Sequence, residues 1–145
     1  MIAVDTNVLV YAHRRETTEH TRATSKLREL ASGRELWAIP WPCLYEFFSV
    51  VTNRRIFKDA ASTPQQAWLQ VEAWTASPSL RLLNETEDFV GVLGGLVQRP
   101  RVVGPVVHDA RVAALCLVHG VAALLTRDRD FSLFPELVTD NPFAS

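Results

Sequence analysis

Four acidic residues lie where the chain is expected to pass from a strand into a helix. Asp5 directly follows the apolar run that opens the chain, and Asp128 follows a second apolar run near its end. Glu46 and Asp109 lie early in segments whose apolar residues recur at helical spacing. Because the carboxyl ends of parallel strands meet at one edge of a sheet, these carboxylates are expected to share a cleft. Close like charges repel, so a divalent cation is their natural partner, and metal-dependent chemistry on phosphate is indicated.

Each of these carboxylates also has an ordinary structural explanation. An aspartate near a helix start favours the helix dipole, as Asp5 and Asp109 would. Asp128 and Asp130 could form a turn and pair with the intervening arginines. Glu46 is the only acid among the large apolar residues around it, so it must face a polar cleft or be desolvated at high cost. Four separate structural explanations are less economical than one shared cleft.

The elements that must position these residues follow from the hydrophobic pattern. Short apolar runs predict strands at residues 2–4, 36–39, 80–83 and 121–125. Helical periodicity predicts helices at residues 8–11, 19–32, 42–51, 64–74, 86–98 and 107–119. Thr6 or Asn7 is expected to cap the first helix, and Thr63 begins a capping box with proline at the first helical position. The tail after Pro135 allows an edge strand.

Strands that alternate with helices predict an α/β fold with a central, mainly parallel sheet flanked by helices. The length of 145 residues suits one domain over residues 1–145. A net charge of −1 is unlike that of a typical non-specific nucleic-acid binder, so any RNA affinity must come from local arginines and bound metal.

The cysteines and the apolar runs narrow the class of protein further. Cys43 and Cys116 lie in apolar helical surroundings without metal-ligand spacing, so buried free thiols are expected. The histidines also lack such spacing, which favours Mg²⁺ or Mn²⁺ on oxygen ligands over zinc. No apolar run is long enough to span a membrane, and we expect a soluble, cytoplasmic protein.

These motifs resemble those of PIN-domain ribonucleases, and specifically the VapC toxins of bacterial toxin–antitoxin pairs. The resemblance covers nearly the whole chain, in the family's order and at the family's usual size. Four segments carry it: residues 2–11, 41–47, 107–114 and 126–131. They place acids at the family's four acidic positions: Asp5, Glu46, Asp109 and Asp128. Asp130 matches an accessory position.

The resemblance implies a PIN-like three-layer sandwich and a Mg²⁺- or Mn²⁺-dependent endoribonuclease toxin. Its substrate would be structured RNA, often transfer or ribosomal RNA. The catalytic, metal-binding carboxylates would be Asp5, Glu46, Asp109 and Asp128, with Asp130 as a further metal ligand. Thr6, Asn7 and Thr126 could orient a ligand or the attacking water. The family also implies a homodimer and a VapB-type antitoxin that covers the active site and supplies any contact with DNA.

Three other functions remain open at this point. A phosphotransfer receiver domain also has an acidic Mg²⁺ site, but it needs a lysine at a late strand end, and the only lysines are Lys26 and Lys58. A phosphatase of the haloacid dehalogenase type would carry an aspartate where this chain has Asn7. A non-catalytic PIN-fold binding module is the third alternative, and the complete set of acids argues against it.

Overall fold

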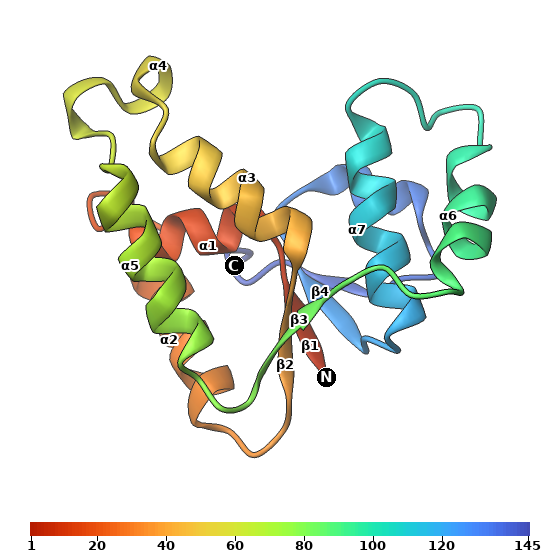
Figure 1. Cartoon of the computed structure of the whole chain (residues 1–145), viewed down its shortest axis with the longest axis horizontal. Helices are drawn as coiled ribbons and strands as arrows, with labels where there is room; N and C mark the ends of the chain where they lie inside the picture. The colour runs from red at the N-terminus through yellow and green to blue at the C-terminus, as the bar shows by residue number, and fades with distance from the viewer.

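Five parallel strands form the sheet at the centre of the computed structural model, which describes all residues 1–145 (Figure 1). The strands are β1 (Ile2–Val4), β2 (Trp37–Pro40), β3 (Leu80–Leu83), β4 (Ala123–Leu125) and β5 (Thr139–Asp140). Their spatial order is β3-β2-β1-β4-β5, and every neighbouring pair is parallel. The expected α/β fold is confirmed, and the tail after Pro135 does add an edge strand, β5.

Seven α-helices and two short 3₁₀ helices connect and cover the strands. The α-helices are α1 (Thr6–His13), α2 (His20–Ser32), α3 (Trp41–Val51), α4 (Arg54–Phe57), α5 (Pro64–Thr75), α6 (Phe89–Val97) and α7 (Val106–Val118). The 3₁₀ helices are η1 (Lys58–Ala60) and η2 (Arg129–Leu133). Helices α1, α2 and α5 lie on one side of the sheet and α6 and α7 on the other (Figure 1), while α3 packs against α1 and α5. These layers form the expected three-layer sandwich.

Local sequence explains where several helices begin. Thr63 and Gln66 form the expected capping box, with hydrogen bonds in both directions between side chain and backbone. The expected cap of α1 is wrong: Asp5 itself is the N-cap, because its carboxylate accepts the backbone N–H of Thr6. Helix α6 begins three residues later than expected, at Phe89, where burial of that ring starts the helix's packing.

The order of the strands creates a crevice beside β1. Strands β1 to β3 are added in one direction, and β4 then joins the opposite side of β1. At such a switch point the connections leave the two strands on opposite faces of the sheet, which opens a crevice at their carboxyl ends. The backbone N–H of Asp5 donates to the carbonyl of Leu125 at 3.0 Å, so the ends of β1 and β4 are held together there.

A single cluster of 34 buried apolar residues fills the space between the sheet and both helical layers. The sheet contributes fully buried residues such as Val4, Ile39 and Leu124. On α3, Phe47 packs edge-to-face against Trp74, with 4.8 Å between ring centroids. Cys43 and Cys116 are buried free thiols, as expected. None of the helices has the length and apolar character needed to cross a membrane.

Truncation of Leu124 to alanine should destabilise the fold, because this side chain is fully buried in the strand that borders the crevice. The expected loss in the free energy of unfolding is about 2–5 kcal/mol, measured by urea denaturation. Val138→Ala is the matched control: Val138 is 61% exposed, so its truncation should change that energy by less than about 0.5 kcal/mol. Equal losses in both variants would contradict the assigned core.

Candidate active site

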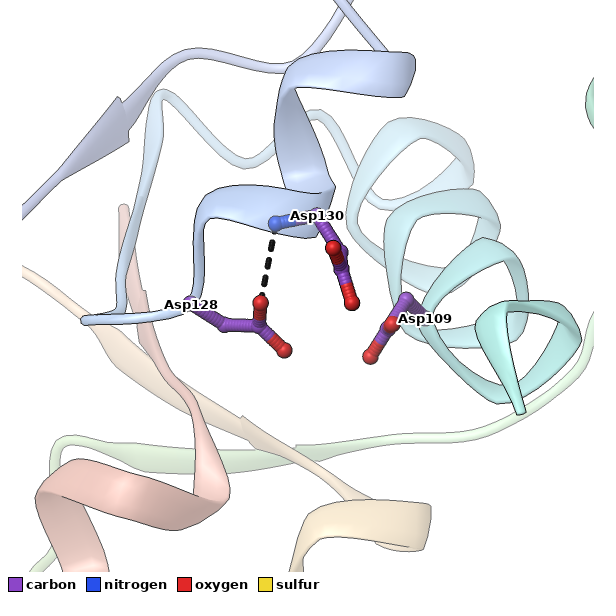
Figure 2. Close-up of side chains that lie close together, drawn as sticks. All are labelled: Asp109, Asp128 and Asp130. Carbon is purple, nitrogen blue, oxygen red and sulfur yellow. Dashed lines mark hydrogen bonds between the residues drawn. The ribbon is translucent and has the colours of Figure 1, made fainter. Parts of the chain in front are cut away.

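Three aspartates converge at the mouth of the crevice. Asp109 lies in the first turn of α7, while Asp128 and Asp130 lie in the segment that leads from β4 into η2. Each offers a carboxylate oxygen, and these oxygens all lie within 4.8 Å of one another. Asp128 caps η2 by accepting the backbone N–H of Asp130 at 2.8 Å, which fixes the Asp128 side chain (Figure 2). Two distant segments therefore present three carboxylates to one point.

The surroundings of Asp109 oppose its ionisation. Desolvation raises the pKa of Asp109 to about 7, and the negative charges of Asp128, Asp5, Asp130 and Glu46 add to the effect. A divalent cation would remove that electrostatic cost. The donors are all carboxylate oxygens, the ligands that hard cations such as Mg²⁺ and Mn²⁺ prefer. The residues therefore fit a hard divalent cation.

Asp5 lies deeper than the three clustered aspartates and is only 7% exposed. One carboxylate oxygen accepts the backbone N–H of Thr6 at 2.8 Å and the thiol of Cys43 at 3.5 Å. The other accepts the hydroxyl of Thr126 at 2.7 Å and the amide of Asn7 at 3.2 Å. Burial raises the pKa of Asp5, although the hydrogen bonds from Thr126, Thr6 and Cys43 oppose the rise. These four donors fix the orientation of the carboxylate.

Glu46 comes from the opposite wall of the crevice. It lies on the exposed face of α3, off the buried stripe, and it accepts the hydroxyl of Thr6 at 3.1 Å. Two adjoining cavities, of about 480 and 560 Å³, are each lined by all four expected acids: Asp5, Glu46, Asp109 and Asp128. The structure therefore brings these acids to one groove. Asp5 and Glu46 lie outside the close cluster, and Asp130, expected only as an accessory, lies inside it.

The three polar residues expected to orient the site form one hydrogen-bonded network. The side-chain amide of Asn7 donates to both Asp5 and Thr126, and its side-chain oxygen, Oδ1, accepts the backbone N–H of Arg127 at 3.1 Å. The Thr126 hydroxyl also accepts the backbone N–H of Asp128 at 3.0 Å. Through these contacts, the start of α1 sets the position of the loop that carries Asp128.

Two contacts near the site were not expected from the sequence. Cys43 donates to Asp5, a contact that a one-dimensional pattern cannot indicate because 38 residues separate the two. Arg14 is buried, with only 6% of it exposed, although most arginines of such a chain would be expected in solvent. Glu16 and the carbonyl of Ala60 hold its guanidinium, which explains how the charge is accommodated. Glu16, two residues after Arg14, is the sequence feature that could have indicated a partner for this charge.

Comparison with known proteins identifies similar sequences over nearly the whole chain. Residues 2–137 match the family model of the PIN domain. Ribonuclease VapC43 from Mycobacterium tuberculosis is 37% identical over 142 residues, which cover 98% of this chain and 95% of that protein. Ribonuclease VapC48 from the same species is 29% identical over 140 residues, with 97% and 96% covered.

Solved structures share the fold at lower sequence identity. The crystal structure of VapC20 from Mycobacterium tuberculosis, described as a sarcin-ricin loop cleaving toxin, matches with a TM-score of 0.66 and 20% identity, over 91% of this chain and 93% of that one. VapBC2 from Rickettsia felis, crystallised with a DNA fragment from its promoter, matches with a TM-score of 0.70 and 20% identity, over 97% and 98%. At this identity the two structures establish the fold alone.

The Asp109 carboxyl should make the metal-free protein less stable as the pH rises. Its pKa is about 7 in the folded protein and about 4 in an unfolded chain, so the cost is absent below pH 4, grows between pH 4 and 7, and is complete above pH 7. With EDTA at pH 8, Asp109→Asn should therefore raise the free energy of unfolding. The expected gain is about 1–2 kcal/mol, once solvent screening of this half-buried group is allowed for.

The difference in the free energy of unfolding between the variant and the unsubstituted protein should be small at pH 4, where Asp109 is protonated in the folded protein and about half protonated in the unfolded chain. Urea titrations at the two pH values measure it. A gain of the same size at both pH values would show that ionisation of Asp109 is not its cause.

Proposed function

The chain belongs to the PIN-domain family, and from that premise we propose that it is a metal-dependent endoribonuclease that hydrolyses RNA phosphodiester bonds. One observation carries the proposal: Asp109, Asp128 and Asp130 converge within 4.8 Å at the mouth of a groove that also holds Asp5 and Glu46. The full-length similarity to relatives named ribonucleases supports the same reaction.

The carboxylates have different roles in the proposed site: three would bind the cation at their converging oxygens, and Asp5 is already held in one orientation by its hydrogen bonds. When bound, Mg²⁺ or Mn²⁺ supplies Lewis acidity to phosphate and lowers the pKa of a water molecule. Asp109, Asp128 and Asp130 would hold the cation at their converging oxygens. Asp5 presents its carboxylate from the floor of the groove in the one orientation that its four donors allow. Glu46 would complete the ligand set from α3.

Thr6, Asn7 and Thr126 keep the buried charge of Asp5 in place, so we assign them a positioning role. Thr6 contacts two acids, through its backbone N–H to Asp5 and its hydroxyl to Glu46. Thr126 donates to Asp5 and accepts from the backbone of Asp128. Rigid support of this kind preserves ligand geometry while substrate binds and leaves.

The proposal extends to partners and location. Relatives named VapC and the resemblance of the motifs support a toxin, and similar folds in VapBC complexes support our proposal that a VapB-type antitoxin neutralises it and supplies any contact with DNA. A homodimer is the assembly that we propose for this family member. We propose transfer or ribosomal RNA as the substrate. Because these RNAs are cytoplasmic, the activity would be located in the cytoplasm.

Loss of a clustered carboxylate should remove RNA cleavage. Asp109→Asn and Asp128→Asn should each lower the rate by about 100-fold or more, because a ligand worth several kcal/mol of transition-state stabilisation is lost. The measurement is cleavage of total RNA by purified, antitoxin-free protein with Mg²⁺ or Mn²⁺, and with EDTA. Asp5→Asn is a less clean test, because its amide nitrogen would face the donors that now bind both Asp5 oxygens.

The matched control is Asp88→Asn, an exposed aspartate at the start of α6 and outside the groove, which should cleave at the unsubstituted rate. Cleavage that persists in EDTA, or in both site variants, would refute the metal-dependent assignment. No cleavage by a folded protein supplied with metal would favour the non-catalytic binding module.

Thr126→Val should slow cleavage without removing it. Valine keeps the shape of the side chain but leaves Asp5 and the backbone of Asp128 without their hydroxyl partner. We expect a loss of about 10–100-fold in activity or metal affinity, the range found when outer partners of metal ligands are replaced. Thr126→Ser retains the hydroxyl and should stay within about threefold of the unsubstituted rate. Equal rates for the valine and serine variants would exclude a positioning role for this hydroxyl.

A further inference from the structure

The acidic groove has two chemically different ends. The cavity of about 560 Å³ adds mainly polar and charged side chains to the acids, among them Ser49, His108 and Arg111. The cavity of about 480 Å³ extends from the acids to Phe57 on α4, and half of its other lining residues are apolar or aromatic. We call it the base pocket and define its walls by four residues: Val10, Tyr11, Val50 and Phe57.

A buried arginine, Arg14, holds the outer wall of the base pocket in place. The Arg14 guanidinium lies 4.0 Å from the centre of the Phe57 ring and donates to the carbonyl of Ala60 at 2.7 Å. Glu16 accepts its Nε–H at 2.7 Å. These contacts fasten the α4–η1 segment to the end of α1. The pocket is therefore preformed, with an aromatic ring fixed in its wall.

The pocket suits a flat apolar group better than a phosphate. Its one cation, Arg14, is already engaged with Glu16, and the carboxylates on its inner side repel negative charge. The hydroxyls at its rim are also engaged: Thr17 donates to the carbonyl of Arg14 at 2.8 Å, and Thr6 donates to Glu46. What the pocket offers a ligand is aromatic and aliphatic surface directly beside the acids.

We propose that the base pocket binds one unpaired nucleobase of the RNA, next to the phosphate that is cleaved. The inference rests on the proposed nuclease function and adds to it a binding site for the base beside the cleaved bond, which must be unpaired to enter the pocket. Every base has a π-face that can stack on an aromatic ring, whereas a base paired in a duplex cannot leave its stack to enter the pocket.

The same contacts predict how the pocket discriminates among bases. Thr6 and Thr17 already donate their hydroxyl protons within the protein, and the Tyr11 hydroxyl, which accepts from Arg127, is the one hydroxyl whose proton is left to read a base edge. Stacking then dominates, and stacking tolerates all four bases. The pocket would select for an unpaired conformation, and sequence preference would have to arise elsewhere on the surface.

The experiment measures binding separately from cleavage. In the full-length chain with Asp109→Asn, which suppresses cleavage, the affinity for a fluorescein-labelled hexamer of adenosine nucleotides, rA6, is measured by anisotropy with Mg²⁺. Phe57→Ala and Phe57→Leu are added to this background; leucine keeps apolar packing under Arg14 but removes the aromatic face. Ile56→Ala is the matched control on α4, since Ile56 is 55% exposed and does not line the pocket. An abasic ribose-phosphate hexamer is the second probe.

The expected result is a loss of rA6 affinity of about 10-fold in Phe57→Ala and a smaller loss in Phe57→Leu, as removal of one stacking contact gives. Ile56→Ala should stay within about twofold of the background, and no variant should alter binding of the abasic hexamer. Thermal unfolding of each variant verifies that it is folded.

Several results would overturn the base pocket. They are unchanged rA6 affinity in a folded Phe57→Ala protein, an equal loss for the abasic hexamer, and no binding of rA6 by the background protein. Unchanged rA6 affinity with weakened binding of a protein partner would assign the pocket to that partner instead. If the unsubstituted protein cleaves RNA while Phe57 has no effect, the pocket fails and the nuclease stands. A base-dependent loss at Phe57 without any cleavage supports the pocket and removes the nuclease assignment.

Discussion

The mutual repulsion of carboxylates at the junction of β1 and β4 is the constraint on which the rest of the site depends. Asp5 and Asp109 accommodate this repulsion in different ways. Asp5 is buried and receives four hydrogen bonds, while Asp109 has a pKa raised to about 7 by desolvation and by its acidic neighbours. Such a cluster costs stability until a cation neutralises it. The fold therefore tolerates a locally unfavourable arrangement whose only evident use is to bind positive charge.

The tolerance comes from how firmly the surrounding backbone is fixed. Strands β1 and β4 are central in the sheet, and their buried side chains belong to the main core. Asp5 and Asp128 each cap the helix that follows them, so both are fixed by local backbone contacts as well as by the site. The capping explanation for these two aspartates is therefore correct, and it is compatible with the metal-binding role that we propose. A cap and a metal ligand require the same thing, a carboxylate held at a strand end.

Much of the fold and most of the site could be predicted because both follow from short-range patterns. Apolar runs marked four strands, and the rule that parallel strands end at one edge placed four acids in one groove. What could not be predicted depends on contacts distant in sequence. Asp130 belongs to the close cluster and Asp5 does not, because the η2 turn brings Asp130 beside Asp128. Arg14 is buried because the segment that carries Ala60 docks against it. The short helix α4 has too little periodicity to be recognised.

The pairing of β1 with β4 also has a consequence for synthesis of the chain. β1 is synthesised well before Asp109, Asp128 and the β4 segment that docks beside β1. Contacts so distant in sequence cannot form on a partial chain. A nascent chain therefore has no assembled acidic centre until the segment that carries Asp128 has left the ribosome. A nuclease built in this way would stay inactive until that point of its own translation, which would protect the RNA that encodes it.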